Sequence, residues 1–260
     1  MNVLKLFDLS GKVALVTGGA GLFGRQIVQA LAEAGARTFM ARRDLAKLQG
    51  QAEAFARQEL DVTALALNQS DIGSVQSLLA EVMRRCPGVD VLVNNAVLRP
   101  MKDWDGAQVY DQFAQSMAVN ATGLFMMTRE FGNHMAQRGG GSIINIGSIQ
   151  GSAGPDFRLY EGLDWGAPPD YFFHKGGMLQ LTRYVAAKLG PSGVRVNTIS
   201  PGGFYSGQDD SFVQRYNAST FLGRMANEAD LQGAVVFLAS DASAYITGTN
   251  LIVDGGYSAK

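Results

Sequence analysis

The chain has few of the residues that build disulfides and metal sites. Among its 260 residues there is one cysteine, Cys86, and two histidines, His134 and His174. A single thiol excludes an intrachain disulfide and a cysteine-based metal site. Two imidazoles are too few for a metal cluster built on histidine. We therefore expect no metal centre.

An excess of one charge and long apolar runs are also missing. The chain carries 22 basic and 23 acidic residues, a formal net charge of −1, so its charge gives no reason to bind nucleic acid or an anionic membrane. No stretch reaches the roughly 18 apolar residues of a membrane span. The first twelve residues lack the apolar core of a signal peptide. We expect a cytoplasmic protein without nucleic-acid or membrane partners.

What the chain does contain is a large apolar fraction and much glycine. Hydrophobic residues make up 47% of it, and 32 residues are glycine. This composition fits one globular domain over residues 1–260 with a full core and many tight turns.

Short apolar runs alternate with segments of helical spacing. The predicted strands are 13–17, 37–41, 62–67, 89–93, 142–146, 194–198 and 250–253, and the predicted helices are 22–34, 45–58, 74–85, 110–135, 171–189 and 230–239. Apolar strands separated by helices predict an α/β fold, a doubly wound parallel sheet of Rossmann type with helices on both faces. Two long irregular stretches, 150–170 and 201–223, have the length typical of binding loops.

Glycines gather where the first predicted strand meets the first helix, in the run Thr17-Gly18-Gly19-Ala20-Gly21-Leu22-Phe23-Gly24. Glycine lets the backbone approach a pyrophosphate, and the helix N-terminus adds amide donors. An ordinary strand-to-helix turn would also use glycine. The strand–turn–helix context favours a dinucleotide site.

The end of the second predicted strand indicates the type of dinucleotide. An acidic residue there would bind the ribose 2′-hydroxyl of NAD, whereas a basic one would accept the 2′-phosphate of NADP. The sequence reads Ala41-Arg42-Arg43-Asp44, and guanidinium groups suit phosphate. NADP(H) is therefore favoured, and NAD(H) stays possible. In the alternative, both arginines face water and Asp44 only caps the next helix.

Tyr171 and Lys175 are four residues apart in a predicted helix, so one face presents both side chains. A nearby ammonium lowers the phenol pKa from its usual value of about 10. A tyrosine tuned in this way can exchange a proton with an alcohol or carbonyl oxygen. Alone, such a pair usually means a packed ring and a solvated charge. Here a third residue, Ser148 at the end of a predicted strand, accompanies the pair and favours a catalytic role.

Taken in order, these motifs resemble the classical short-chain dehydrogenase/reductase family over residues 12–257. The matching parts are the turn 17–24, Asn94-Asn95-Ala96, Asn120, Ser148, Tyr171 with Lys175, Pro201-Gly202, Thr247-Gly248 and Val253-Asp254-Gly255-Gly256. The resemblance implies an enzyme that transfers a hydride between NAD(P) and a hydroxyl or carbonyl carbon. It also implies a homotetramer formed through the helices 110–135 and 171–189.

The resemblance further implies roles for single residues. Tyr171 would be the general acid/base, Lys175 would lower its pKa and hold the nicotinamide ribose, and Ser148 would bind the reacting oxygen. Asn120 would hold a water that links Lys175 to solvent. The implied cofactor-binding residues are Thr17, Gly18, Gly21, Leu22, Phe23, Gly24, Arg42, Arg43, Asn68, Asn94, Ala96, Lys175, Pro201 and Gly202.

The chain departs from the family pattern at several positions. Leu22 replaces the usual second glycine of the turn, Asn68 replaces an aspartate that binds adenine, and Val97 replaces a glycine. Ser148 and Tyr171 are also farther apart than is usual, and the extra residues lie within 151–169. Tyr160 falls at a more usual distance from Ser148, but no lysine follows it four residues later. Tyr171 is therefore preferred.

The inserted residues 151–169 mix aromatic and charged side chains, whereas a pocket for a steroid or acyl chain should be mainly apolar. We expect a sugar, sugar acid or polyol as substrate, as in the gluconate dehydrogenase-like members that the chain resembles. The alternatives are a 3-oxoacyl-thioester reductase and a non-catalytic nucleotide-binding regulator. The candidate substrate-binding residues are Arg99, Gln150, Arg158 and Trp165, and solvated charges are the alternative for the two arginines.

Overall fold

A computed structural model describes residues 2–259 and contains one seven-stranded parallel sheet of order β3-β2-β1-β4-β5-β6-β7. The strands are β1 (Val13–Thr17), β2 (Arg37–Arg42), β3 (Val62–Ala66), β4 (Val91–Asn94), β5 (Gly141–Ile146), β6 (Val194–Pro201) and β7 (Asn250–Val253). Neighbouring strands pair in parallel throughout. The predicted doubly wound α/β fold is confirmed.

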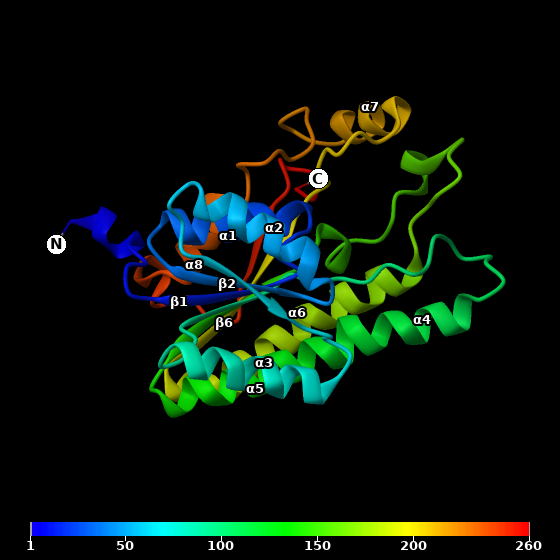
Figure 1. Ribbon diagram of the computed structural model, residues 1–260. Coiled ribbons are helices and arrows are strands. Elements are labelled where there is room, and N and C mark those ends of the chain that lie inside the picture. The colour runs from blue at the N-terminus through cyan, green and yellow to red at the C-terminus, as the bar shows by residue number, and fades with distance from the viewer. Residues whose placement is uncertain (1, 260) are drawn as a thin grey trace.

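Helices cover both faces of the sheet (Figure 1). On one face lie α1 (Leu22–Glu33), α2 (Leu45–Ala56) and α8 (Gln232–Ala239), and on the other lie α3 (Ile72–Arg85), α5 (Leu124–Gln137) and α6 (Pro169–Leu189). The helix α4 (Val109–Met117) precedes α5, and α7 (Asp210–Ala218) lies beyond the carboxyl ends of the strands (Figure 1). None of the helices in this described part is long and apolar enough to cross a membrane.

The apolar runs are explained by burial on both faces. Every residue of β1 is buried, and successive side chains point to opposite faces of the sheet. Val16 belongs to the core under α1 and α8, while Leu15 belongs to the core under α3, α5 and α6. A strand between two helical layers therefore needs apolar residues at every position.

The strand order reverses between β1 and β4. After β3 at one edge, the chain crosses back to place β4 beside β1. The loops that follow β1 and β4 consequently diverge, and ligands of open α/β sheets bind in the crevice that this divergence leaves.

The predicted helix 110–135 is helical over its whole length, but it is not α-helical throughout. A π-helical segment, Ala118–Gly123, separates α4 from α5. At Gly123 a Cβ would meet the main-chain oxygen of Gln69, so the helix passes very close to the loop after β3. A π segment inserts one residue into a helix and often marks a functional site; here it contains Asn120.

The stretch 201–223 was predicted to be irregular, and this is only partly correct. It contains α7, whose first turn is capped by the Asp209 carboxylate accepting from the amide of Ser211 at 2.8 Å. The stretch 150–170 holds short 3-10 turns at Ile149–Gly151 and Phe157–Tyr160 and is otherwise irregular. Another short 3-10 helix, Val3–Phe7, was also not predicted. Most other boundaries move by a few residues.

Candidate functional site

A cavity of about 810 Å³ lies at the carboxyl ends of the strands, where the order reverses. Its walls come from the glycine turn after β1, the end of β2, and the loops after β3, β4, β5 and β6. Among the predicted site residues, those that line it are Gly18, Gly21, Leu22, Phe23, Arg42, Arg43, Asn68, Ala96, Arg99, Ser148, Gln150, Trp165, Tyr171, Lys175, Pro201 and Gly202.

The glycine turn is packed too tightly for side chains at several positions, including Gly18 and Gly24. Gly18 has φ +66°, and a Cβ there would lie 2.8 Å from the Cα of Ala96. A Cβ on Gly24, in the first turn of α1, would collide with the main-chain oxygen of Gly18. Leu22, which replaces the family's glycine, points outward and is 59% exposed beside the cavity. The backbone at the start of α1 is therefore open to an anionic ligand.

Asn95, which we had not selected as a binding residue, holds this turn in place. Its side-chain amide donates to the carbonyls of Thr17 and Gly18, both at 3.0 Å. The Thr17 hydroxyl in turn accepts from the amides of Asn95 and Ala96 at 3.1 and 3.0 Å. Thr17 thus joins the loops after β1 and β4. A second asparagine directly after a strand was the available sequence signal.

Arg42 and Arg43 reach the cavity at the end of β2, and neither forms a salt bridge within residues 2–259. The Asp44 carboxylate accepts from the amide of Lys47 at 3.1 Å and caps α2. The only acid of this run is therefore committed to a helix end, while both arginines line the cavity. Asn68 also lines the cavity, and its side-chain oxygen, Oδ1, accepts from the Ser70 hydroxyl at 2.9 Å.

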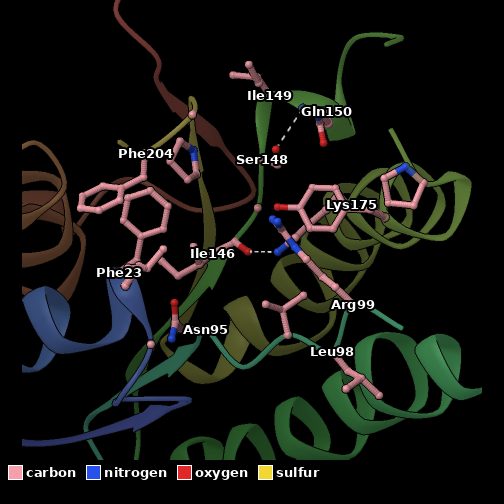
Figure 2. Close-up of a pocket in the computed structure, with 18 of the residues that line it drawn as sticks. Phe23, Asn95, Leu98, Arg99, Ile146, Ser148, Ile149, Gln150, Lys175 and Phe204 are labelled. Carbon is pink, nitrogen blue, oxygen red and sulfur yellow. Dashed lines mark hydrogen bonds between the residues drawn. The ribbon is translucent and has the colours of Figure 1, made fainter. Parts of the chain in front are cut away.

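Ser148, Tyr171 and Lys175 meet on the other side of the cavity. All three are buried, with exposed fractions of 7%, 9% and 4%. The Lys175 ammonium donates to the carbonyl of Ile146 at 2.5 Å, and the Ser148 hydroxyl accepts from the amide of Gln150 at 3.1 Å (Figure 2). The end of β5 and the first turns of α6 therefore bring together residues that are far apart in sequence.

The pKa of Tyr171 is lowered by its surroundings. Burial alone raises the pKa of this phenol, but the charges of Lys175 and Arg99 favour the phenolate, and hydrogen bonds from Ser148 and Arg99 act in the same direction. The pKa of Lys175 is lowered by burial, an effect that the neighbouring Tyr171 opposes. The balance produces a phenol that ionises more easily than usual.

Arg99 is the second cation of this cluster. Its guanidinium carbon lies 4.2 Å from the centroid of the Tyr171 ring, closer than the Lys175 nitrogen at 5.6 Å. The sequence had suggested Arg99 only as a substrate-binding residue. Its loop is fixed by Asn120, whose side chain accepts from the Leu98 amide at 2.9 Å and donates to the Leu98 carbonyl at 2.7 Å.

Two other titratable groups near Tyr171 are poorly suited to proton transfer at neutral pH. Burial lowers the pKa of His174 to about 3, so this imidazole stays neutral. Burial raises the pKa of Tyr160, the other tyrosine considered from the sequence. The contrast between Tyr160 and Tyr171 agrees with the preference for Tyr171.

Five predicted site residues lie outside the cavity wall: Thr17, Gly24, Asn94, Asn120 and Arg158. Two of them, Asn94 and Arg158, contact other side chains. The Asn94 amide donates to Asn145 at 2.9 Å and to Thr128 at 3.2 Å inside the core, because successive strand residues point to opposite faces. The Arg158 side chain is 83% exposed and pairs with Asp156 at 2.8 Å. Within residues 2–259, no group of acidic, histidine and cysteine side chains is arranged to hold a metal ion.

An aromatic wall closes the end of the cavity away from the glycine turn. Tyr160 and Trp165, from the inserted residues 151–169, meet Phe212 of α7 with ring centroids 5.6 and 4.9 Å away. Tyr216 and Tyr257 stack beside them at 5.0 Å. Phe212 and Tyr216 were not selected from the sequence, although their spacing of four residues is typical of one helical face.

Comparison with known proteins agrees with this geometry. The family model described as enoyl-(acyl carrier protein) reductase matches residues 20–258. The chain belongs to the short-chain dehydrogenase/reductase family, whose members are oxidoreductases that act on CH–OH groups with a nicotinamide cofactor.

Several relatives match over almost their entire length. Galactitol 2-dehydrogenase (L-tagatose-forming) of Cereibacter sphaeroides is 34% identical over 99% of both chains. A crystal structure of a gluconate 5-dehydrogenase from Burkholderia cenocepacia with NADP and tartrate superposes with a TM-score of 0.87, 29% identity and full coverage of both chains. A short-chain dehydrogenase from Leptospira borgpetersenii, solved with NAD+, gives a TM-score of 0.84 and 29% identity, over 96% of this chain and 94% of that one.

Proposed function

We propose that the protein is an NADP(H)-dependent dehydrogenase of a sugar, sugar acid or polyol, built as one dinucleotide-binding domain. The observation that carries this proposal is the position of Tyr171. It is buried beside Ser148, between the cations Lys175 and Arg99, and it faces a cavity that continues to the glycine turn of α1. The cofactor supplies or accepts the hydride when it is bound.

In this proposal Tyr171 is the general base of oxidation and the general acid of reduction. Lys175 and Arg99 stabilise its phenolate, and the Ser148 hydroxyl binds the oxygen of the reacting alcohol or carbonyl. Lys175 also binds the nicotinamide ribose. Asn120 acts indirectly, through Arg99, because its side chain fixes the backbone of the neighbouring Leu98.

The preference for NADP(H) is supported by the two arginines at the end of β2. Both line the cavity, and the neighbouring Asp44 caps a helix. Guanidinium groups bind phosphate through charge-assisted hydrogen bonds. A structural relative holds NADP and another holds NAD+, so the fold alone does not set the cofactor, and the preference proposed here rests on this chain's own residues.

A polyhydroxylated substrate is supported by the lining of the cavity and by the galactitol and gluconate dehydrogenases that the chain resembles. The proposed substrate end of the cavity combines an aromatic ring, that of Trp165, with the polar side chains of Gln150 and Arg99. Rings stack on the apolar face of a sugar, and amide and guanidinium groups bind hydroxyl and carboxylate oxygens.

The proposal is tested by assaying the purified protein with a panel of sugar acids, polyols and 3-oxoacyl thioesters, each with NADP(H) and with NAD(H). We expect the highest kcat/KM on a sugar acid or polyol with NADP(H). The competing candidate is a 3-oxoacyl-thioester reductase, which is supported by the 32% identity to the 3-oxoacyl-[acyl-carrier-protein] reductase FabG of Vibrio harveyi. Activity confined to acyl substrates would select that candidate and refute the sugar proposal.

Arg99 is proposed to bind a substrate carboxylate, since no carboxylate of residues 2–259 pairs with it and it lines the cavity. The variant Arg99→Met should lower kcat/KM for acidic substrates at least about tenfold more than for neutral polyols. Losing the cation also removes support for the phenolate and raises the pKa of Tyr171, so the pH profile of oxidation should move to higher pH. Equal losses on acidic and neutral substrates would contradict the carboxylate role.

We also propose a homotetramer. Large hydrophobic side chains are exposed on the helices that the family resemblance assigns to the interface, namely Tyr110 on α4, Phe125 on α5, and Phe173 and Tyr184 on α6. Exposed apolar surface of this kind is typical of contacts between subunits.

We further propose that the substrate is a small molecule, that the protein is located in the cytoplasm, and that it has no nucleic-acid or membrane partner.

A further inference from the structure

The inserted residues 151–169, here called the strap, pack against α7 in their middle part. Leu159 of the strap is 5% exposed and forms a small core with Phe212 and Tyr216 of α7 and with Met225. This core is separate from the two cores that flank the sheet. Strap and α7 lie at the same end of the molecule, beyond the carboxyl ends of the strands (Figure 1).

A single side chain ties the two segments together. Arg215 of α7 donates from Nη1 to three main-chain oxygens of the strap, those of Leu159 and Glu161 at 2.9 Å and that of Arg158 at 3.3 Å. Arg215 is half-buried and forms no salt bridge within residues 2–259. Its charge is therefore directed at the carbonyls around the end of the 3-10 turn Phe157–Tyr160.

The hydrogen bonds between Arg215 and the strap affect the cavity through the aromatic residues of the strap. Tyr160 and Trp165 of the strap line it together with Phe212 of α7, whereas Arg215 itself does not. Tyr160 contacts Trp165 at 5.3 Å, edge to face, and also receives a hydrogen bond from Gln150 at 3.4 Å. The positions of these rings thus depend on how firmly the strap is held.

We infer that Arg215 is a positioning residue that joins the strap and α7 into one substrate wall, against which a ring or hydrocarbon face of the substrate packs. Without Arg215, the strap keeps only its small core and its ring contacts, and a segment of irregular backbone with few buried groups opens easily. The wall then no longer presents Tyr160 and Trp165 in one arrangement, and substrate binding pays for ordering them.

Tryptophan fluorescence can report the state of the wall without any substrate, because the chain has two tryptophans and one of them lies in the wall. Trp165 lies in the wall and Trp104 is 76% exposed in the loop after β4. In a Trp104→Phe background, the fluorescence of the full-length protein reports Trp165 alone. With Arg215→Ala added, we expect red-shifted emission and an acrylamide quenching constant that rises about threefold, because the half-buried Trp165 ring becomes more accessible.

The second readout is kinetic and rests on the proposed function, because it uses the best substrate found by the panel. Arg215→Ala should raise the KM of that substrate about tenfold while the KM of NADPH changes less than about twofold. Arg215→Lys, which keeps a charge and three donors, should give intermediate values. Arg57→Ala, a change at an exposed arginine that ends α2, is the matched control and should resemble the parent.

The outcomes are distinguishable. Unchanged quenching in Arg215→Ala would overturn the inference whatever the substrate is. The quenching measurement needs no catalytic activity. Increased quenching with an unchanged substrate KM would show that the wall does not position the substrate, which also overturns it. If no substrate of the panel is turned over, the proposed function fails while the fluorescence still decides whether Arg215 holds the strap.

Discussion

Replacing Tyr171 by phenylalanine should lower kcat by roughly a thousandfold, within the range that general acid-base groups contribute. The change removes one oxygen and leaves the ring, so the packing against Arg99 and His174 is retained. The proton of the substrate hydroxyl then has no acceptor. His174 does not replace the phenol, because burial keeps its pKa at about 3, and Tyr160 has a raised pKa.

The measurement is kcat under saturating substrate together with the Kd of NADPH from its fluorescence on binding. We expect an unchanged Kd within about threefold, since the hydroxyl acts on the reacting oxygen. His174→Phe is a less suitable control because the ring is buried, so Tyr160→Phe serves instead. It removes a hydroxyl that contacts Gln150 and should keep most of kcat. Loss of activity in Tyr160→Phe with retention in Tyr171→Phe would reverse the assignment.

Removing both arginines at the end of β2 should reverse the cofactor preference. In Arg42→Ala/Arg43→Ala the KM for NADPH is expected to rise roughly a hundredfold, because two charge-assisted hydrogen bonds to the 2′-phosphate are lost. The KM for NADH should change little, since NADH has no phosphate at that position. Both side chains are on the surface of the cavity and outside the cores, so folding should be retained.

The ratio of kcat/KM for NADPH to that for NADH, measured as a function of salt, is the relevant quantity. The parent's preference should weaken at high ionic strength, because salt screens exposed charges, while the double variant should show no such dependence. Asp44→Asn tests whether the acid of this run takes part in cofactor binding. If Asp44 bound a ribose hydroxyl instead of capping α2, this variant would impair NADH use selectively, and the NADP proposal would be wrong.

Much of the architecture was predictable because it depends on local periodicity. A strand covered on both faces must be apolar throughout, as β1 is, and this pattern is visible in any such strand. The family motifs indicated Ser148, Tyr171 and Lys175 for a similar reason, because each stands at a fixed place relative to a strand end or a helical turn.

Other features of the site are set by contacts that only the folded chain shows. Asn94 turns into the core while Asn95 holds the glycine turn, and one residue of strand register decides which of the two does so. Arg158 pairs with Asp156 two residues away and stays outside the cavity. The π-helical segment at Asn120 lies against the loop after β3, and no helical pattern within 110–135 reveals it.

The sequence by itself determined the sheet, the glycine turn and the placing of Tyr171 and Lys175 on one face of a helix, because these follow from residue spacing along single elements. Only the tertiary structure decided that Arg99 stacks on Tyr171 and that Arg215 joins the strap to α7. These contacts link loops whose paths are set by packing, and charge and aromatic interactions act over a few ångströms in space, whatever the separation in sequence.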